Sequence, residues 1–210
     1  MLWLKTYRPQ LYEVAPEVQA RMDEGNAVGD LAMGLFGEFT EVTALKADGR
    51  LDVSRMIENT KNALIAGVSV ICEASFSYHG LYCAVDILRK TENGYEFYEV
   101  KNSSVVKPIH LQDASYQRYV LEKCGVKLVG AYIVTVNPDY QRPETGKPDL
   151  QAMFRFQEIG KELTEKSEIE LDLKIAERMI KSHVEPKMSV GEHCHSPYEC
   201  GFQKYCFGKE

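Results

Sequence analysis

The stretch LYCAVDILRKTENGYEFYEVKNS, residues 81–103, predicts a β-hairpin. Aromatic and aliphatic residues recur through both halves, and Asn93-Gly94 between them is a strong signal for a tight hairpin turn. The preceding stretch VSVICEASFSY, residues 68–78, predicts another strand, which ends at His79-Gly80. The three strands together predict an antiparallel meander.

Helices are expected on both sides of this meander. Apolar residues at helical spacing predict one or two helices within residues 15–36, with breaks near Gly25 and Gly29. Another helix is expected over residues 52–66, where Gly67 ends it. After the meander, residues 109–125 predict a helix, and the β-branched stretch VKLVGAYIVTVN, residues 126–137, predicts a buried strand. The order predicts an α/β fold: a mixed central sheet, made of a three-stranded meander, a helix and a further strand, flanked by helices.

The C-terminal third alternates loop and helix signals. Residues 139–150 are rich in Pro, Gly and charge and predict a loop, and AMFRFQEI, residues 152–159, is a candidate edge strand. SEIELDLKIAERMIKSHV, residues 167–184, has the pattern of an amphipathic helix. The final stretch, residues 194–210, is short, aromatic and cysteine-rich.

Composition limits the classes of function. The chain has 210 residues, 44% of them hydrophobic, enough for one domain with a real core. Its formal net charge of -6 argues against polyanion binding over the whole surface, and leaves a local basic site or a bound metal as routes to nucleic acid. No apolar run approaches the ~20 residues that cross a membrane, and the N-terminus lacks a signal-peptide pattern. We expect a cytoplasmic protein with no membrane partner.

Asp86 occupies an otherwise apolar part of the hairpin, where a carboxylate is costly unless it is paired or binds a cation. The hairpin brings it near Glu99 and Lys101. Two carboxylates beside an ammonium predict a site for Mg²⁺ or Mn²⁺, with the Val100 carbonyl as a further ligand. Lys101 would then hold or deprotonate the attacking water, or stabilise charge on a phosphate, which indicates phosphodiester hydrolysis. Taken singly, the same residues are explained by a same-face ion pair and a turn-capping Asp86.

The order Asp, hairpin turn, Glu-x-Lys, helix resembles the PD-(D/E)xK nuclease superfamily. The helix after it contains Gln112-Asp-Ala-Ser-Tyr116, which is similar to the QxxxY motif of the RecB-like exonuclease branch, including its CRISPR-associated members. The resemblance implies a restriction-endonuclease-like core. It implies a single nuclease domain, residues 1–210, with a helical N-terminal part (1–67), a catalytic core (68–137) and a C-terminal helix and cysteine-rich tail (138–210).

The activity implied by this resemblance is metal-dependent exonuclease cleavage of DNA, from linear ends. Its setting would be DNA repair, recombination or CRISPR adaptation, with proteins of those pathways as partners. One alternative is a noncatalytic nucleic-acid-binding or scaffold module that kept the nuclease fold. Another is a restriction-like endonuclease, against which the QxxxY-like helix and the cysteine tail argue.

Further site residues follow from the motif. Gln112 and Tyr116 project from one helical face and would position the DNA strand, whereas Asp113 with Gln117 offers an equally good pair one residue along. We favour the first pair. Glu73, an acid in the apolar stretch ICEASF, is a candidate to orient water or metal, or else an edge-strand glutamate. The cations expected to hold DNA electrostatically are Lys107, His110, Arg118, Lys123 and Lys127.

Many RecB-like nucleases carry a metal-binding His in the N-terminal helical region. The corresponding stretch here, EGNAVGDLAMGLF, residues 24–36, has Gly29 or Asp30 at that place. This departure leaves the number of catalytic metals open.

Cys194, Cys200 and Cys206 recur with five residues between them. In RecB-like relatives, a C-terminal cysteine trio and one cysteine near the N-terminus hold a [4Fe-4S] cluster, whose usual ligands are four thiolates. The stretch LWLKTYRP, residues 2–9, is similar to the segment that follows a Cys-Pro pair in those relatives, so we expect the fourth ligand upstream. The alternatives are a zinc site completed by His193 or His195, and three reduced cysteines.

Overall fold

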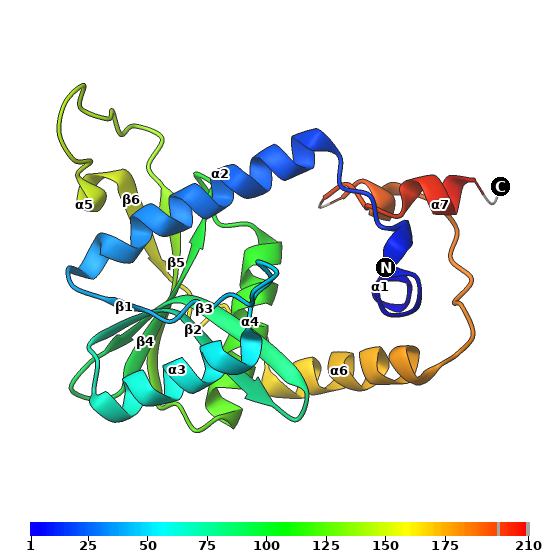
Figure 1. Ribbon diagram of the computed structural model, residues 1–210, viewed down its shortest axis with the longest axis horizontal. Helices are drawn as coiled ribbons and strands as arrows, with labels where there is room; N and C mark the ends of the chain where they lie inside the picture. The colour runs from blue at the N-terminus through cyan, green and yellow to red at the C-terminus, as the bar shows by residue number, and fades with distance from the viewer. Residues whose placement is uncertain (197, 209–210) are drawn as a thin grey trace. The chain divides into compact units, whose positions relative to one another are not determined.

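A six-stranded mixed β-sheet organises residues 25–164 in the computed structural model, which describes residues 1–196 and 198–208 (Figure 1). The strands lie in chain order, and β1–β2 and β4–β5 are parallel whereas β2–β3, β3–β4 and β5–β6 are antiparallel. The fold is α/β with helices flanking a mixed sheet, as predicted. The strands are β1 Thr40–Glu41, β2 Val70–Tyr78, β3 Leu81–Lys90, β4 Tyr95–Lys101, β5 Leu128–Val136 and β6 Phe154–Glu158.

The predicted meander is confirmed in β2, β3 and β4. Its first turn places Gly80 at φ 84°, in the left-handed region that favours glycine. At the second turn, a Cβ added to Gly94 would lie 2.4 Å from the carbonyl oxygen of Lys127. Only glycine fits there, because the chain passes directly beside the start of β5.

The helix α2, Pro16–Ala32, runs without a break through Gly25 and Gly29, and a 3-10 turn, η2 Met33–Phe36, follows it. The expected breaks at the two glycines were wrong. A glycine inside a helix costs only about 1 kcal/mol relative to alanine, and the last turns of α2 are held by packing on the sheet.

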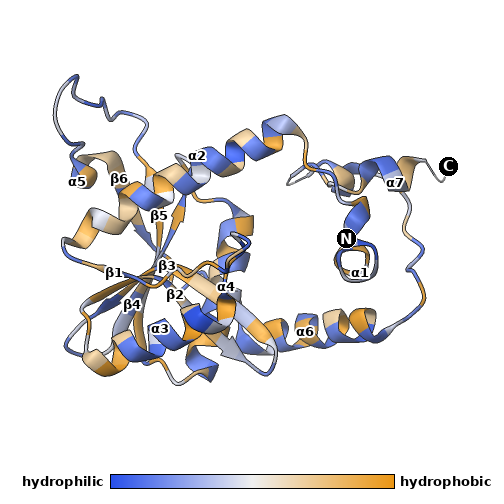
Figure 2. Ribbon diagram, in the orientation of Figure 1, coloured by the Kyte–Doolittle hydropathy of each residue, from blue (hydrophilic) through white to orange (hydrophobic). Residues whose placement is uncertain are grey.

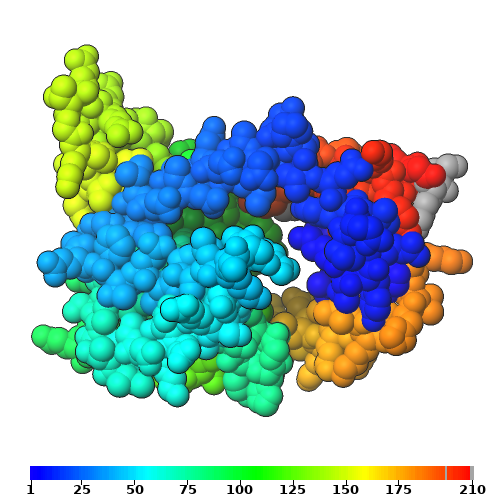
Figure 3. Space-filling model, viewed as in Figure 1, coloured from blue at the N-terminus to red at the C-terminus, as the bar shows by residue number. Residues whose placement is uncertain are grey.

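Residues 25–164 form one compact unit, which we call unit 2. Its remaining elements follow the sequence signals closely. The helix α3, Val53–Ala66, opens with the Asp52 side chain accepting a hydrogen bond from the Arg55 N–H, and Gly67 ends it at φ 73°. The helix α4, Pro108–Lys123, connects the parallel strands β4 and β5, which need such a crossover. The short helix α5, Leu150–Met153, was not predicted, and it follows the predicted loop and leads into the edge strand β6. Figure 3 shows this loop, in yellow-green, projecting from unit 2.

One face of the sheet is closed by the end of α2, by η2 and by α5. The buried side chains there form a single hydrophobic cluster. Tyr98 of β4 lies in it, stacked on Tyr132 at 4.7 Å between ring centroids, and Phe36 packs against Tyr98 at the same separation. The opposite face carries α4, which contacts β2, β3 and β5. Glu99 and Lys101 alternate with Tyr98 and Val100, so they face α4.

The two ends of the chain form a second compact unit, unit 1, from residues 1–24 and the described residues beyond 164. Trp3 donates from Nε1 to the Ser182 carbonyl at 2.7 Å, and Phe202 is fully buried in a cluster with Trp3 and Leu4. The predicted C-terminal helix is present as α6, and its bands of hydrophobic and hydrophilic residues are visible in Figure 2. The elements of unit 1 are α1 Leu2–Tyr7, η1 Pro9–Leu11, α6 Lys166–Lys181, η3 Glu192–Cys194 and α7 Gln203–Phe207. In the described part of the chain, no helix has both the length and the apolar character that crossing a bilayer requires.

Candidate active site

Asp86 lies where β3 and β4 separate. The paired residues of this ladder end at Ile87 and Tyr98, and one position further the Oδ2 atom of Asp86 accepts a hydrogen bond from the Val100 N–H at 2.6 Å. The carboxylate therefore replaces a backbone acceptor. Because the N–H and C=O of a strand residue project to the same side, the Val100 carbonyl also projects toward the strand of Asp86.

Glu99 and Lys101 form a short ion pair at the carboxyl end of β4. The Nζ atom of Lys101 donates to Oε1 of Glu99 at 2.7 Å and to Oδ2 of Asp113, on α4, at 2.6 Å. The Glu99 side chain is 8% exposed and that of Asp113 is 42% exposed. Lys101 thus joins a buried carboxylate on the sheet to a partly exposed one on the helix.

Gln117 completes the surroundings of Glu99. Its Nε2 atom donates to Oε2 of Glu99 at 2.8 Å, so both carboxylate oxygens of Glu99 accept hydrogen bonds. Gln117 is buried, and its Oε1 atom has no hydrogen-bond partner among the described residues. Asp113 and Gln117 are one helical turn apart and reach Lys101 and Glu99 together.

The favoured register of the helix motif is therefore not the one that reaches the site. Gln112 is exposed. Tyr116 instead connects α4 to β3, since its hydroxyl accepts from the Tyr82 N–H at 3.2 Å and donates to the Tyr82 carbonyl at 3.0 Å. Both pairs share the same spacing, so spacing could not separate them.

Glu73 of β2 lies opposite Asp86 of β3, at a position between two paired residues of the β2–β3 ladder. Its φ of 58° is left-handed, which is uncommon for a residue with a side chain and is found at functional sites. β2 lies between β1 and β3, so Glu73 is not on an edge strand of the sheet. Burial raises the pKa of Glu73 to about 7, and the charge of Glu99 adds to the shift.

The other charged groups are strongly perturbed. Burial raises the pKa of Asp86, although the Val100 N–H opposes the shift, and burial together with the charge of Asp86 raises the pKa of Glu99. Burial lowers the pKa of Lys101, but the carboxylates of Glu99 and Asp113 outweigh it and hold the pKa above its usual value. The raised pKa favours the charged ammonium, which can stabilise negative charge beside it.

Two of the cations expected to hold DNA are not available for it. His110 is buried, its Nδ1 accepts from the Lys107 N–H at 3.2 Å, and burial lowers its pKa, so it is neutral at physiological pH. Arg118 donates to the Thr164 carbonyl at 2.7 Å and secures the chain after β6.

Two others lie at the wrong end of the sheet. Lys101 pairs with Thr135 near the end of β5, whereas Lys127 precedes β5 and Lys123 ends α4. Only Lys107 of the five is an exposed cation at the same end as Lys101.

Gly29 and Asp30, the two candidates for the place where the RecB-like resemblance implies a histidine, lie in α2. The charge of Asp30 contributes to raising the pKa of Glu73, after burial, Glu99 and Glu41. Among the described residues, however, no group of three or more His, Cys, Asp or Glu side chains is arranged to hold a metal ion. The arrangement at β4 supplies two carboxylates and one backbone carbonyl.

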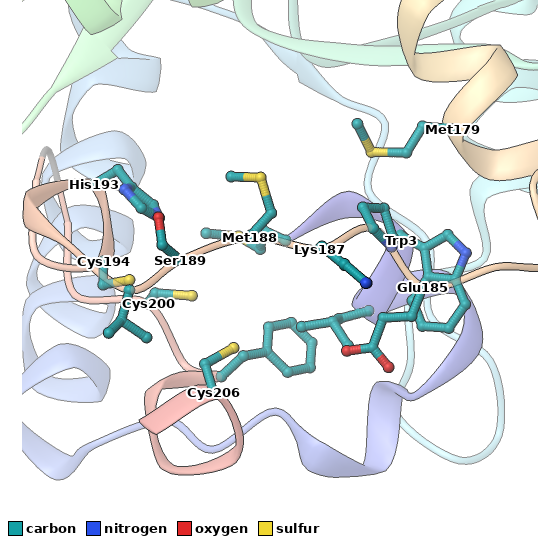
Figure 4. Close-up of a pocket in the computed structure, with 15 residues that line it drawn as sticks. Trp3, Met179, Glu185, Lys187, Met188, Ser189, His193, Cys194, Cys200 and Cys206 are labelled. Atoms are coloured by element: carbon teal, nitrogen blue, oxygen red, sulfur yellow. The ribbon is translucent and has the colours of Figure 1, made fainter. Parts of the chain in front are cut away.

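The C-terminal cysteines are brought together in unit 1. Cys194, Cys200 and Cys206 are free thiols and line one pocket of about 690 Å³, on the side away from Trp3 in the view of Figure 4. His193 also lines this pocket. His195, by contrast, contacts Glu199 through its Nδ1 atom at 3.0 Å. Of the two histidines considered as zinc ligands, His193 is the one that lines the pocket of the cysteines, although no three of these described side chains are arranged to hold a metal ion.

Comparison with models of known families, with curated proteins and with solved structures gives no match. The site is therefore interpreted from its own chemistry.

Proposed function

We propose that this chain is a metal-dependent nuclease that hydrolyses phosphodiester bonds in DNA, built on a restriction-endonuclease-like core in unit 2. One observation carries the proposal. At the end of β4, the Val100 N–H donates to the Asp86 carboxylate of β3, and the adjacent Glu99 carboxylate accepts from the Lys101 ammonium. An acid pair and a fixed cation at a strand end are the groups that metal-assisted phosphodiester hydrolysis needs.

The donor set fits a hard divalent cation. The carboxylates of Asp86 and Glu99 and the Val100 carbonyl are all oxygen donors, the type that Mg²⁺ and Mn²⁺ prefer, and Mg²⁺ commonly binds through one or two carboxylates with several waters. With Glu73 and Asp113, the site has four partly or fully buried carboxylates and one lysine. A bound cation would offset this excess of negative charge, and when bound it would activate water and polarise the phosphate.

The protein groups have distinct roles in this proposal. Lys101 supplies positive charge to the phosphate as negative charge develops. Gln117 orients Glu99 through the 2.8 Å hydrogen bond, and Asp86 fixes the Val100 backbone through the 2.6 Å hydrogen bond. Each contact restrains a group that faces the metal position.

We further propose that the substrate is linear DNA and that cleavage proceeds from an end, as the RecB-like resemblance implies, in DNA repair, recombination or CRISPR adaptation. A net charge of -6, and Lys107 as the single exposed cation of the five expected ones at the same end of the sheet as Lys101, support binding that depends on the metal more than on a basic surface.

The experiment is a cleavage assay with labelled linear and circular DNA, single- and double-stranded, with Mg²⁺ or Mn²⁺. We expect degradation of linear DNA only, and a loss of at least about 100-fold in Asp86→Ala and Lys101→Ala, since each removes a group that acts on the phosphate or its metal. Cleavage of circular DNA would support an endonuclease instead. DNA binding without cleavage by wild type would leave the noncatalytic module as the function.

A second metal group is proposed for unit 1. The resemblance implies a [4Fe-4S] cluster on Cys194, Cys200 and Cys206. The described pocket supplies three thiols, one fewer than the usual four, so the cluster fits only with a further ligand. Three thiolates and His193 are also a donor set suited to zinc.

A further inference from the structure

We propose that Asp113 is a positioning residue that shares the Lys101 ammonium with Glu99, and so keeps Glu99 available as a metal ligand. The inference rests on the proposed function, because it assigns a role within the same site.

Lys101 is held by two carboxylates on separate elements. An ammonium has three N–H donors on a flexible four-carbon stem. One donor reaches Glu99 on β4 and a second reaches Asp113 on α4, at 2.7 and 2.6 Å. Two anchors on separate elements fix the direction of the Lys101 side chain. Its third donor has no hydrogen-bond partner in the described part of the chain and is left for a phosphate oxygen.

In this proposal the Lys101 ammonium and the metal compete for the Glu99 carboxylate. Without Asp113, the ammonium would keep Glu99 as its only anionic partner and would neutralise the carboxylate that the metal needs. With Asp113 present, the positive charge is divided between two carboxylates, and only one of them, Glu99, also accepts from Gln117. Outer partners of metal ligands typically contribute 10- to 100-fold to metal affinity or activity.

Exposure makes the role testable. The Asp113 side chain is 42% exposed, so Asp113→Asn keeps its shape and removes no core packing. Asp139 offers a charge-matched control, since its Oδ2 pairs with Arg155 at 2.6 Å and both side chains are exposed. Arg155 pairs with Thr135, which in turn pairs with Lys101, so Asp139→Asn removes the same charge at the same end of the sheet.

The experiment measures Mn²⁺ binding without DNA, from the electron paramagnetic resonance signal of free Mn²⁺, and cleavage of linear DNA in parallel. We expect Asp113→Asn to weaken Mn²⁺ binding by about 10-fold or more and to lower kcat. Asp113→Glu should recover part of both, and Asp139→Asn should stay within about twofold of wild type. Melting curves of each variant establish that it is folded.

The outcomes separate the inference from the proposed function. Mn²⁺ affinity in Asp113→Asn equal to that of wild type, or equal losses in Asp113→Asn and Asp139→Asn, overturns the inference. Wild type that binds Mn²⁺ but cleaves no DNA contradicts the proposed function alone, and the Mn²⁺ affinities still test the role of Asp113. Wild type that binds no Mn²⁺ overturns both.

Discussion

At the residue scale, the buried carboxylates should make the stability of the metal-free protein fall as the pH rises. The pKa of Glu73 is raised from 4.5 to about 7, and burial raises those of Asp86 and Glu99, to which the charges of Glu73 and Asp86, respectively, add. The folded state therefore holds protons that the unfolded state has already released. The resulting stability is complete below about pH 4.5 and is lost as the pH rises through the raised pKa values.

The measurement is urea unfolding with a chelator between about pH 5 and pH 8. We expect the free energy of unfolding to fall by on the order of 1–3 kcal/mol across this range. Mn²⁺ should restore more stability at pH 8 than at pH 5, because it binds the ionised carboxylates. Glu73→Gln should flatten the metal-free profile. A profile that rises toward pH 8 would contradict the electrostatic description of the site.

At the element scale, Tyr116 is expected to stabilise the contact of α4 with β3 without acting on DNA. Its hydroxyl makes two hydrogen bonds to the backbone of Tyr82. Tyr116→Phe should reduce the free energy of unfolding by about 1–3 kcal/mol, since it leaves two backbone groups with fewer partners. Cleavage at temperatures below the transition should be unchanged. A large loss of kcat with unaltered stability would return Tyr116 to the catalytic set.

The elements themselves could largely be predicted from local signals. Asn93-Gly94 and Gly67 are local signals for a turn and a helix end, and the structure has a turn and a helix end there. The rotation of α4 depends instead on which side chains pack on the sheet. For this reason the sequence offered two pairs at equal spacing, and the structure brings only Asp113 and Gln117 to Glu99 and Lys101.

Some features of the site could likewise be predicted from local signals, and others could not. A hairpin places Asp86 near Glu99 by its register, so their proximity could be predicted. The left-handed φ of Glu73 and the burial of His110 have no local signal in the sequence. The expectation that Lys123 and Lys127 lie near Lys101 could not be checked from the sequence for a similar reason. They are close to Lys101 in sequence but lie at the opposite end of the parallel strand pair.

At the scale of the whole molecule, the chain closes unit 1 from its two ends. Trp3 and Phe202 are nearly 200 positions apart and share one buried cluster. No local pattern indicates such a pairing, and α1 was accordingly not predicted. The cluster forms part of the wall of the pocket that Cys194, Cys200 and Cys206 line.

This arrangement gives the cysteine pocket a decisive test. We expect anaerobically purified protein to be brown, with a broad absorption band at roughly 400 nm and bound iron and sulfide. Cys200→Ala should abolish the band, because it removes a thiolate inside the pocket, whereas Cys124→Ala should not, because Cys124 caps α4 in unit 2. Colourless protein with zinc that is lost in both Cys200→Ala and His193→Ala would instead establish a site of three thiolates and one imidazole. Colourless protein without metal would show that the three thiols are simply reduced cysteines in a pocket. The cysteine pocket and Lys101 lie in different units, so Lys101→Ala should leave the colour unchanged.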